Sequence, residues 1–137
     1  MTATILPGYR MRRLIHRGHS FAVYDAWSVE RGCPVVVKLA RPEASAEAAG
    51  RLLAEGRRLV DLSHPHLVRA YEVHERPRPA VVLETLPGET LGHLFDRCGA
   101  LRWRDVAEMG RQIASALGMS ENAAPIGDGE SVPWIPK

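Results

Sequence analysis

A short strand that ends in a lysine, Val35-Val36-Val37-Lys38, constrains this chain more than any other feature of its sequence. It closes the stretch 9–39, where the pattern predicts three strands joined by a glycine-bearing turn and a hairpin loop. Because side chains alternate across a strand, Lys38 and Val36 share one face, opposite to the other two valines. Lys38 therefore emerges beside an apolar surface.

The choice of basic residues makes Lys38 stand out further. Sixteen arginines and a single lysine, Lys38, lie between residues 1 and 118, and the other lysine, Lys137, is the last residue. A lysine ammonium is a compact point charge that behaves differently from a planar guanidinium. The use of lysine at this one position, where arginine is used everywhere else up to residue 118, favours a chemical role for Lys38. The alternative is an edge-strand lysine whose stem packs along the valines while its ammonium reaches water.

Composition restricts the classes of function that fit. At 137 residues and a net charge of +2, with the arginines dispersed along the sequence, the chain is expected to be one domain that binds neither nucleic acid nor a membrane surface. No apolar run is long enough for a membrane span, and the opening residues do not show a signal-peptide pattern. Cys33 and Cys98 lie far apart without a CxxC pattern, which indicates free thiols and a cytoplasmic protein.

The part of the chain beyond the lysine strand alternates between helix and strand patterns. A helix is expected over 46–62, with Ser45 as its N-cap and Leu52, Leu59 and Val60 as its apolar stripe. The remaining expected elements are strands at 67–73 and 80–85, a short helix at 90–97, and a helix at 103–117 with Gly118 as its C-cap.

A single acid lies on the apolar face of the helix predicted over 46–62. Glu55 follows Leu52 by three residues and precedes Leu59 by four, so it shares their face. A carboxylate on an apolar stripe needs a partner. The alternative is that Glu55 pairs with Arg51 or Arg58 along the helix surface.

These residues resemble the amino-terminal lobe of protein kinases, most of all the bacterial serine/threonine kinases. The family's glycine-rich loop, G-x-G-x-x-G-x-V, falls on residues 16–23, where Gly18 and Val23 match the pattern. His16 and Phe21 stand where the outer two glycines would be. Loss of those glycines restricts how closely the loop folds over phosphates.

The strand that ends in Lys38 corresponds in this resemblance to the family's V-A-I-K motif. Val36 then takes the place of the alanine that lines the adenine pocket, and its extra branching crowds that pocket. The glutamate of the following helix pairs with the motif lysine in kinases and holds it on the phosphates of ATP. The resemblance therefore pairs Lys38 with Glu55.

The strand at 80–85 corresponds to the strand that leads into the kinase hinge. Leu83 would be the gatekeeper, and the backbones of Glu84 and Leu86 would face the adenine edge. The alternative for Glu84 is an ordinary solvated acid at the end of a strand. The complete set of nucleotide-binding residues that the resemblance implies is Gly18, Val23, Val36, Lys38, Glu55, Leu83, Glu84 and Leu86.

The resemblance also implies a fold and a division of the chain. We expect an α+β fold, with an antiparallel five-stranded sheet and one packed helix, then one short and one long helix, then a disordered tail. The amino-terminal lobe would span 8–86, the hinge and the first helices of an incomplete carboxy-terminal lobe would span 87–118, and a flexible tail would follow over 119–137.

The sequence lacks the motifs that carry kinase chemistry. A catalytic loop H-R-D-x-x-x-x-N, a D-F-G and an A-P-E are all missing, so no catalytic residue is assigned and the chain is expected to be truncated before the catalytic loop. Mg²⁺ is expected only if a missing lobe is supplied. His64 and His66 flank Pro65 in what we interpret as a structural turn, because no third metal ligand has suitable spacing.

Two functions follow. The first is a truncated serine/threonine kinase with a half-formed ATP cleft and no transferase activity of its own. The alternative is a catalytically dead kinase-like module that binds a protein partner, or a second copy of itself, through the helix at 103–117. Val106, Met109, Ile113 and Leu117 recur there at helical spacing, and an uncovered apolar stripe marks an interaction surface.

Overall fold

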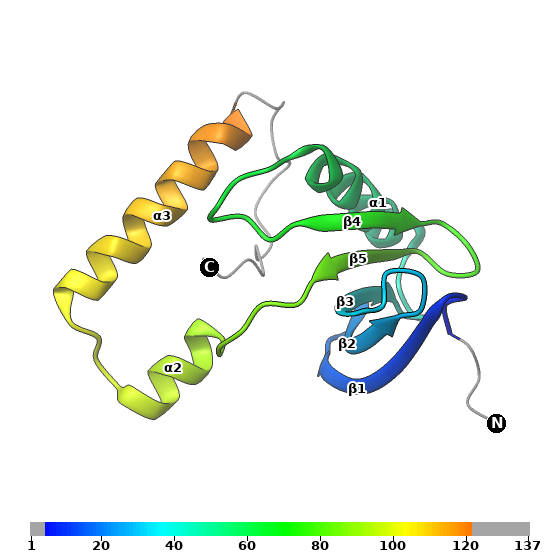
Figure 1. Ribbon diagram of the computed structural model, residues 1–137, viewed down its shortest axis with the longest axis horizontal. Coiled ribbons are helices and arrows are strands. Elements are labelled where there is room, and N and C mark those ends of the chain that lie inside the picture. The colour runs from blue at the N-terminus through cyan, green and yellow to red at the C-terminus, as the bar shows by residue number, and fades with distance from the viewer. Residues whose placement is uncertain (1–4, 122–137) are drawn as a thin grey trace. The chain divides into compact units, whose positions relative to one another are not determined.

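The computed structural model describes residues 5–121 (Figure 1). The chain forms two compact units. The first, Met1–Leu62 with Arg69–Thr85, contains a sheet and one helix, and the second, Ser63–Val68 with Leu86–Lys137, contains two helices. Residues 122–137, most of the expected tail, lie outside the described part of the chain.

The elements follow the order β1 (Tyr9–Arg17), β2 (Phe21–Ser28), β3 (Cys33–Ala40), α1 (Ala46–Asp61), β4 (Ala70–His74), β5 (Ala80–Glu84), α2 (Leu91–Cys98) and α3 (Trp103–Glu121). The strands form one five-stranded sheet in the order β1-β2-β3-β5-β4, and every neighbouring pair is antiparallel. The expected α+β fold is confirmed, with β3 at the centre of the sheet.

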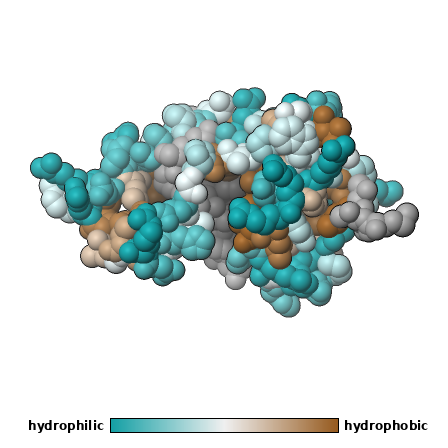
Figure 2. Space-filling view, turned by 60° about the horizontal axis from the view of Figure 1, so that its bottom comes forward, coloured by the Kyte–Doolittle hydropathy of each residue, from teal (hydrophilic) through white to brown (hydrophobic). Residues whose placement is uncertain are grey.

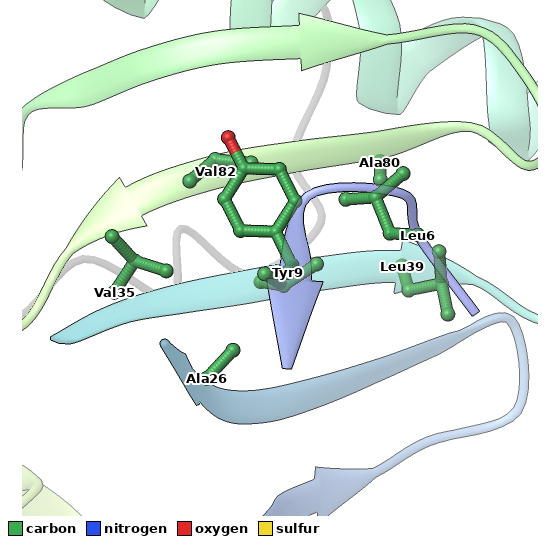
Figure 3. Packing of buried hydrophobic residues seen from close by; sticks show 8 residues of the cluster. Leu6, Tyr9, Ala26, Val35, Leu39, Ala80 and Val82 are labelled. Atoms are coloured by element: carbon green, nitrogen blue, oxygen red, sulfur yellow. The ribbon is translucent and has the colours of Figure 1, made fainter. Parts of the chain in front are cut away.

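One face of the sheet carries the main hydrophobic core. Val35, Val37 and Leu39 of β3 are at most 1% exposed. They pack with residues of β1, β2 and β5 and with the segment before β1, namely Leu6, Tyr9, Ala26, Ala80 and Val82 (Figure 3). The alternation predicted for the lysine strand therefore holds, and burying these β-branched and leucine side chains fixes the register of β3.

Helix α1 packs against β3, β4 and β5. It begins as predicted, because the hydroxyl of Ser45 accepts a hydrogen bond from the backbone N–H of Ala48 at 3.1 Å. Gly56 brings the helix close to the sheet: a Cβ atom there would lie 2.5 Å from Cγ2 of Val81 and 2.8 Å from Cγ2 of Val73. The absence of a side chain at Gly56 thus sets the distance between helix and sheet.

Three details of the sequence prediction were wrong. Val60 is exposed and lies off the buried stripe, because Leu52, Gly56 and Leu59 already form the face that meets the sheet. Strand β4 begins at Ala70 rather than at 67, since the N–H of Leu67 donates to the carbonyl of His64 within a turn.

The third error concerns the end of the last helix. Helix α3 continues through Gly118 to Glu121, so the first three residues of the expected tail are helical. Gly118 does not adopt the positive φ of a C-cap, and a glycine in ordinary helical geometry weakens a helix without ending it.

The second unit holds α2 and α3. The hydroxyl of Thr90 caps α2 by accepting a hydrogen bond from the N–H of His93 at 3.1 Å. Hydrophobic residues reach the surface of the molecule in several places between hydrophilic ones (Figure 2). Over the described residues, none of the helices combines the length and the apolar character that crossing a membrane requires.

Candidate functional site

The candidate site lies on the sheet face opposite the main core. In the antiparallel register, Lys38 of β3 is opposite Val23 on β2 and Val81 on β5. Two residues earlier on β3, Val36 is opposite Leu83 on β5. Directly opposed residues in an antiparallel pair point to the same side of a sheet, so these five side chains share one face.

Helix α1 brings an acid to this face. The Nζ atom of Lys38 lies 3.9 Å from Oε1 of Glu55, and the lysine side chain is only 13% exposed. The glutamate side chain is 38% exposed as a whole, yet its Oε1 is buried and has no hydrogen-bond partner in the described structure. One carboxylate oxygen is therefore directed inward, at ion-pair distance from the ammonium.

The alternative pairings of Glu55 are not formed. Arg51 pairs instead with Glu47, at 3.8 Å along the exposed face of α1. Within residues 5–121, the ion pair described for Glu55 is the one with Lys38. The structure thus brings together the two residues that the sequence had suggested as partners.

Phe21 adds a contact that sequence reasoning missed. The Nζ atom of Lys38 lies 5.2 Å from the centre of the Phe21 ring, within the range of a cation–π interaction. Phe21 begins β2 and pairs with Ala40 of β3, two positions beyond the lysine. The pairing register of β2 and β3 could have indicated this contact, whereas the motif alone marked Phe21 only as a missing glycine.

A backbone hydrogen bond closes the turn between β1 and β2, and Gly18 in this turn does not have a positive φ. The N–H of Gly18 donates to the carbonyl of Phe21 at 2.8 Å. A Cβ atom at Gly18 would meet that carbonyl at 3.5 Å and Nε2 of His16 at 3.6 Å, which are ordinary contacts. The described conformation does not itself require glycine at position 18.

Arg41 is a second residue that sequence reasoning missed. Its guanidinium donates from Nη1 to the carbonyl oxygens of Gly18, at 2.7 Å, and His19, at 3.0 Å. Its backbone N–H donates to the carbonyl of Ser20 at 2.8 Å. No local sequence pattern predicts these bonds, because they join the residue after β3 to a turn more than 20 residues earlier in the sequence.

The hinge-side residues are distributed over both units. Leu83 is buried in β5. The backbone N–H of Glu84 donates to the carbonyl of Arg69 at 2.9 Å, and its Oε1 accepts from the N–H of Arg69 at 2.9 Å, so its side chain is not simply solvated. Leu86 belongs to the second unit. The roles of Glu84 and Leu86 toward adenine stay predictions.

The side chains around Lys38 suit an anionic ligand. A shielded ammonium beside an inward carboxylate oxygen and apolar side chains can bind an anion that carries an apolar ring. No three His, Cys, Asp or Glu side chains in the described part of the chain lie close enough together to hold a metal ion. His64 and His66 instead form a turn in which the N–H of His66 donates to Nδ1 of His64 at 3.1 Å.

A separate hollow lies on the first unit. It has a volume of about 310 Å³ and is lined by Arg10, Arg12 and Trp27 of β1 and β2. It includes neither Lys38 nor Glu55. The candidate site is therefore taken at the ion pair, where the shielded ammonium of Lys38 lies beside the inward Oε1 of Glu55.

Comparison with known proteins gives one consistent result. Residues 9–124 match the family described as "Protein tyrosine and serine/threonine kinase". Serine/threonine-protein kinase PknA of Mycobacterium tuberculosis is 31% identical over 128 residues, which cover 88% of this chain and 30% of that protein. CBL-interacting protein kinase 4 of Oryza sativa is 35% identical over 108 residues, covering 76% of this chain and 23% of that protein.

Solved structures share the fold. Rad53 1-466, in complex with AMP-PNP, matches with a TM-score of 0.71 and 22% identity over 85% of this chain and 31% of that chain. The apo form of PpkA-294 matches with a TM-score of 0.59 and 17% identity over 68% of this chain and 41% of that chain. The chain spans less than a third of the length of the curated relatives named above.

Proposed function

We propose that this chain, which belongs to the protein tyrosine and serine/threonine kinase family, supplies the phosphate-holding half of the ATP site of a serine/threonine kinase. The observation that carries the proposal is the 3.9 Å approach of the Lys38 ammonium to Oε1 of Glu55. In kinases a lysine and a glutamate in these positions form the pair that holds the nucleotide phosphates.

Each member of the pair has a separate task in the proposal. Lys38 binds phosphate oxygens through its ammonium, and Glu55 holds that ammonium in place from α1. The face around them supplies apolar contact for the base through Val23, Val36 and Leu83, and the backbone of Glu84 faces the adenine edge. The part predicted for the backbone of Leu86, in the second unit, stays a prediction. Bound ATP would contribute the phosphoryl group that kinases transfer. Its analogue AMP-PNP is present in the Rad53 complex, which supports this choice of ligand.

We do not expect the 137-residue chain, assayed alone, to transfer that phosphoryl group. Transfer needs two metal-binding side chains and an acid at the substrate hydroxyl, arranged in advance around the phosphate. The sequence contains no H-R-D or D-F-G motif that would provide them. Mg²⁺ accordingly enters the proposal only together with a second lobe that carries its ligands.

A second candidate function rests on α3. Val106, Ile113 and Leu117 are 51%, 42% and 49% exposed, and Trp103 is 74% exposed. Large apolar side chains that stay exposed along one helix favour a protein-binding surface. We therefore propose as the alternative a catalytically dead kinase-like module that binds a protein partner or a second copy of itself through α3.

The free thiols of Cys33 and Cys98 fit a reducing compartment, so we extend both proposals to a cytoplasmic location.

Calorimetric titration with ATP tests the first proposal, that Lys38 and Glu55 form part of an ATP site. Lys38→Met should weaken ATP binding at least about tenfold, the loss of one or two charge-assisted hydrogen bonds. Lys137→Met, which removes the same charge elsewhere, should leave the affinity unchanged. Equal affinities in the two variants would contradict the proposal, as would a wild-type chain that does not bind ATP.

A further inference from the structure

One arginine holds the turn between β1 and β2. Three consecutive carbonyl groups of that turn, those of Gly18, His19 and Ser20, accept hydrogen bonds from Arg41, two from its guanidinium and one from its backbone N–H. The arginine side chain is only 17% exposed. Hydrogen bonds from a charged donor are stronger than neutral ones, and partial burial protects them from competition with water.

These bonds fix the direction of the peptide groups of the turn. In a trans peptide the N–H points opposite to the C=O of the same unit. With the carbonyls of Gly18 and His19 directed at the guanidinium, the N–H groups of His19 and Ser20 are directed away from it. Successive backbone N–H groups that point to one side form a site suited to an anion.

We infer that Arg41 is a positioning residue that holds this turn ready for the phosphates of a nucleotide, an inference that rests on the proposed ATP site. His16 and Phe21 replace two glycines of the family's loop, so the backbone has less freedom to adapt to a ligand. A turn already fixed in its binding conformation loses less entropy when the ligand binds. Arg41 lies outside the turn, and its hydrogen bonds hold the backbone of the turn in the conformation that phosphate binding needs.

The guanidinium acts through the turn and is not itself a phosphate ligand. Its Nη1 is shared between two carbonyl oxygens, and its Nη2 donates to Oε1 of Glu43 at 3.1 Å. The nearby carboxylate balances its charge. Removing Arg41 should therefore affect binding by releasing the turn, and removing Glu43 should have little effect.

The full chain offers a matched control for this test. Arg78 also donates from its guanidinium to a carbonyl at the end of β3, that of Ala40 at 2.5 Å, but it has no bond to the turn. Arg41→Gln and Arg78→Gln thus remove the same charge from neighbouring places. Arg41→Lys keeps a charged donor and should restore part of any loss.

Two measurements separate the turn from the ligand. Without nucleotide, amide hydrogen exchange at Gly18, whose N–H closes the turn, should become about tenfold faster in Arg41→Gln and stay unchanged in Arg78→Gln. With ligand, Arg41→Gln should weaken ATP about tenfold and adenosine less than twofold, because adenosine has no phosphates.

Unchanged exchange at Gly18 in Arg41→Gln would overturn the inference. So would an equal loss of affinity for ATP and adenosine, which would indicate a general loss of structure. A wild-type chain that does not bind ATP would contradict the proposed function. It would also contradict the part of this inference in which the ordered turn binds phosphates. The exchange measurement would still decide whether Arg41 orders the turn.

Discussion

The ammonium of Lys38 lies 3.9 Å from Oε1 of Glu55, across the contact between β3 and α1. The two residues come from elements that pack for a different reason, the close fit of Gly56 onto Val81 and Val73. The ion pair therefore depends on apolar packing for its geometry. Its own contribution to stability is expected to be small, because the glutamate is partly exposed.

A double-mutant cycle with Lys38→Met and Glu55→Gln should separate folding from binding. In urea unfolding we expect a coupling free energy of at most about 1 kcal/mol, the range for partly exposed ion pairs. In ATP affinity the two losses should not add, because each substitution disables the same phosphate contact. Fully additive losses of affinity would show that the two residues act independently.

Gly56→Ala should destabilise the first unit. A methyl group there would lie within 3 Å of two valine side chains, and forcing α1 away from the sheet should cost about 1–3 kcal/mol. Gly50→Ala in the same helix is the matched control, since a Cβ atom there meets nothing within 4 Å. It should stabilise the helix by up to about 1 kcal/mol. Urea unfolding that moves both variants in the same direction would contradict this packing.

Glu108 on α3 should titrate unusually low. Hydrogen bonds from the side chains of Arg111 and Gln112 lower the pKa of its carboxyl to about 2. The folded pKa is depressed, so the stabilisation is present above the unfolded pKa of about 4.3 and is lost as pH falls toward 2. Carboxyl chemical shifts followed by NMR would give this pKa. Arg111→Gln should raise it, and an unchanged value would contradict the assigned cause.

The exposed stripe of α3 should control self-association if the alternative function holds. Ile113→Lys with Leu117→Lys places charge on the stripe, while Ala107→Lys with Ala114→Lys adds the same charge at other exposed positions of the helix. In sedimentation velocity at rising concentration, the wild type and the alanine-site variant should form oligomers and the stripe variant should stay monomeric. A wild-type chain that stays monomeric at every concentration would contradict the proposal that the chain binds a second copy of itself through α3.

Much of the fold was predictable because it follows from local rules. Period-two alternation placed β3, and the hydroxyl of Ser45 marked the start of α1. Helical spacing placed Glu55 on the apolar face of α1, and the resemblance to protein kinases named Lys38 as its partner.

The errors arose where tertiary contacts decide the structure. Val60 fits helical spacing but is exposed, because the face of α1 that meets the sheet contains Gly56. The packing of Gly56 against β4 and β5 follows from no local pattern. The bonds of Arg41 to the turn join segments distant in sequence, and the cation–π contact of Phe21 depends on the pairing register. Gly118 looked like a helix end only because glycine is common there.

The thermal stability of the chain, measured with and without ATP, shows whether Lys38 belongs to a nucleotide site. Ligand that binds only the folded state at a hundred times its dissociation constant adds about 2.7 kcal/mol, or several degrees in Tm for a domain of this size. If Lys38 holds the phosphates, ATP should raise the Tm of the wild-type chain and leave that of Lys38→Ala unchanged. An equal rise in both proteins, or no rise in the wild type, would contradict this role of Lys38.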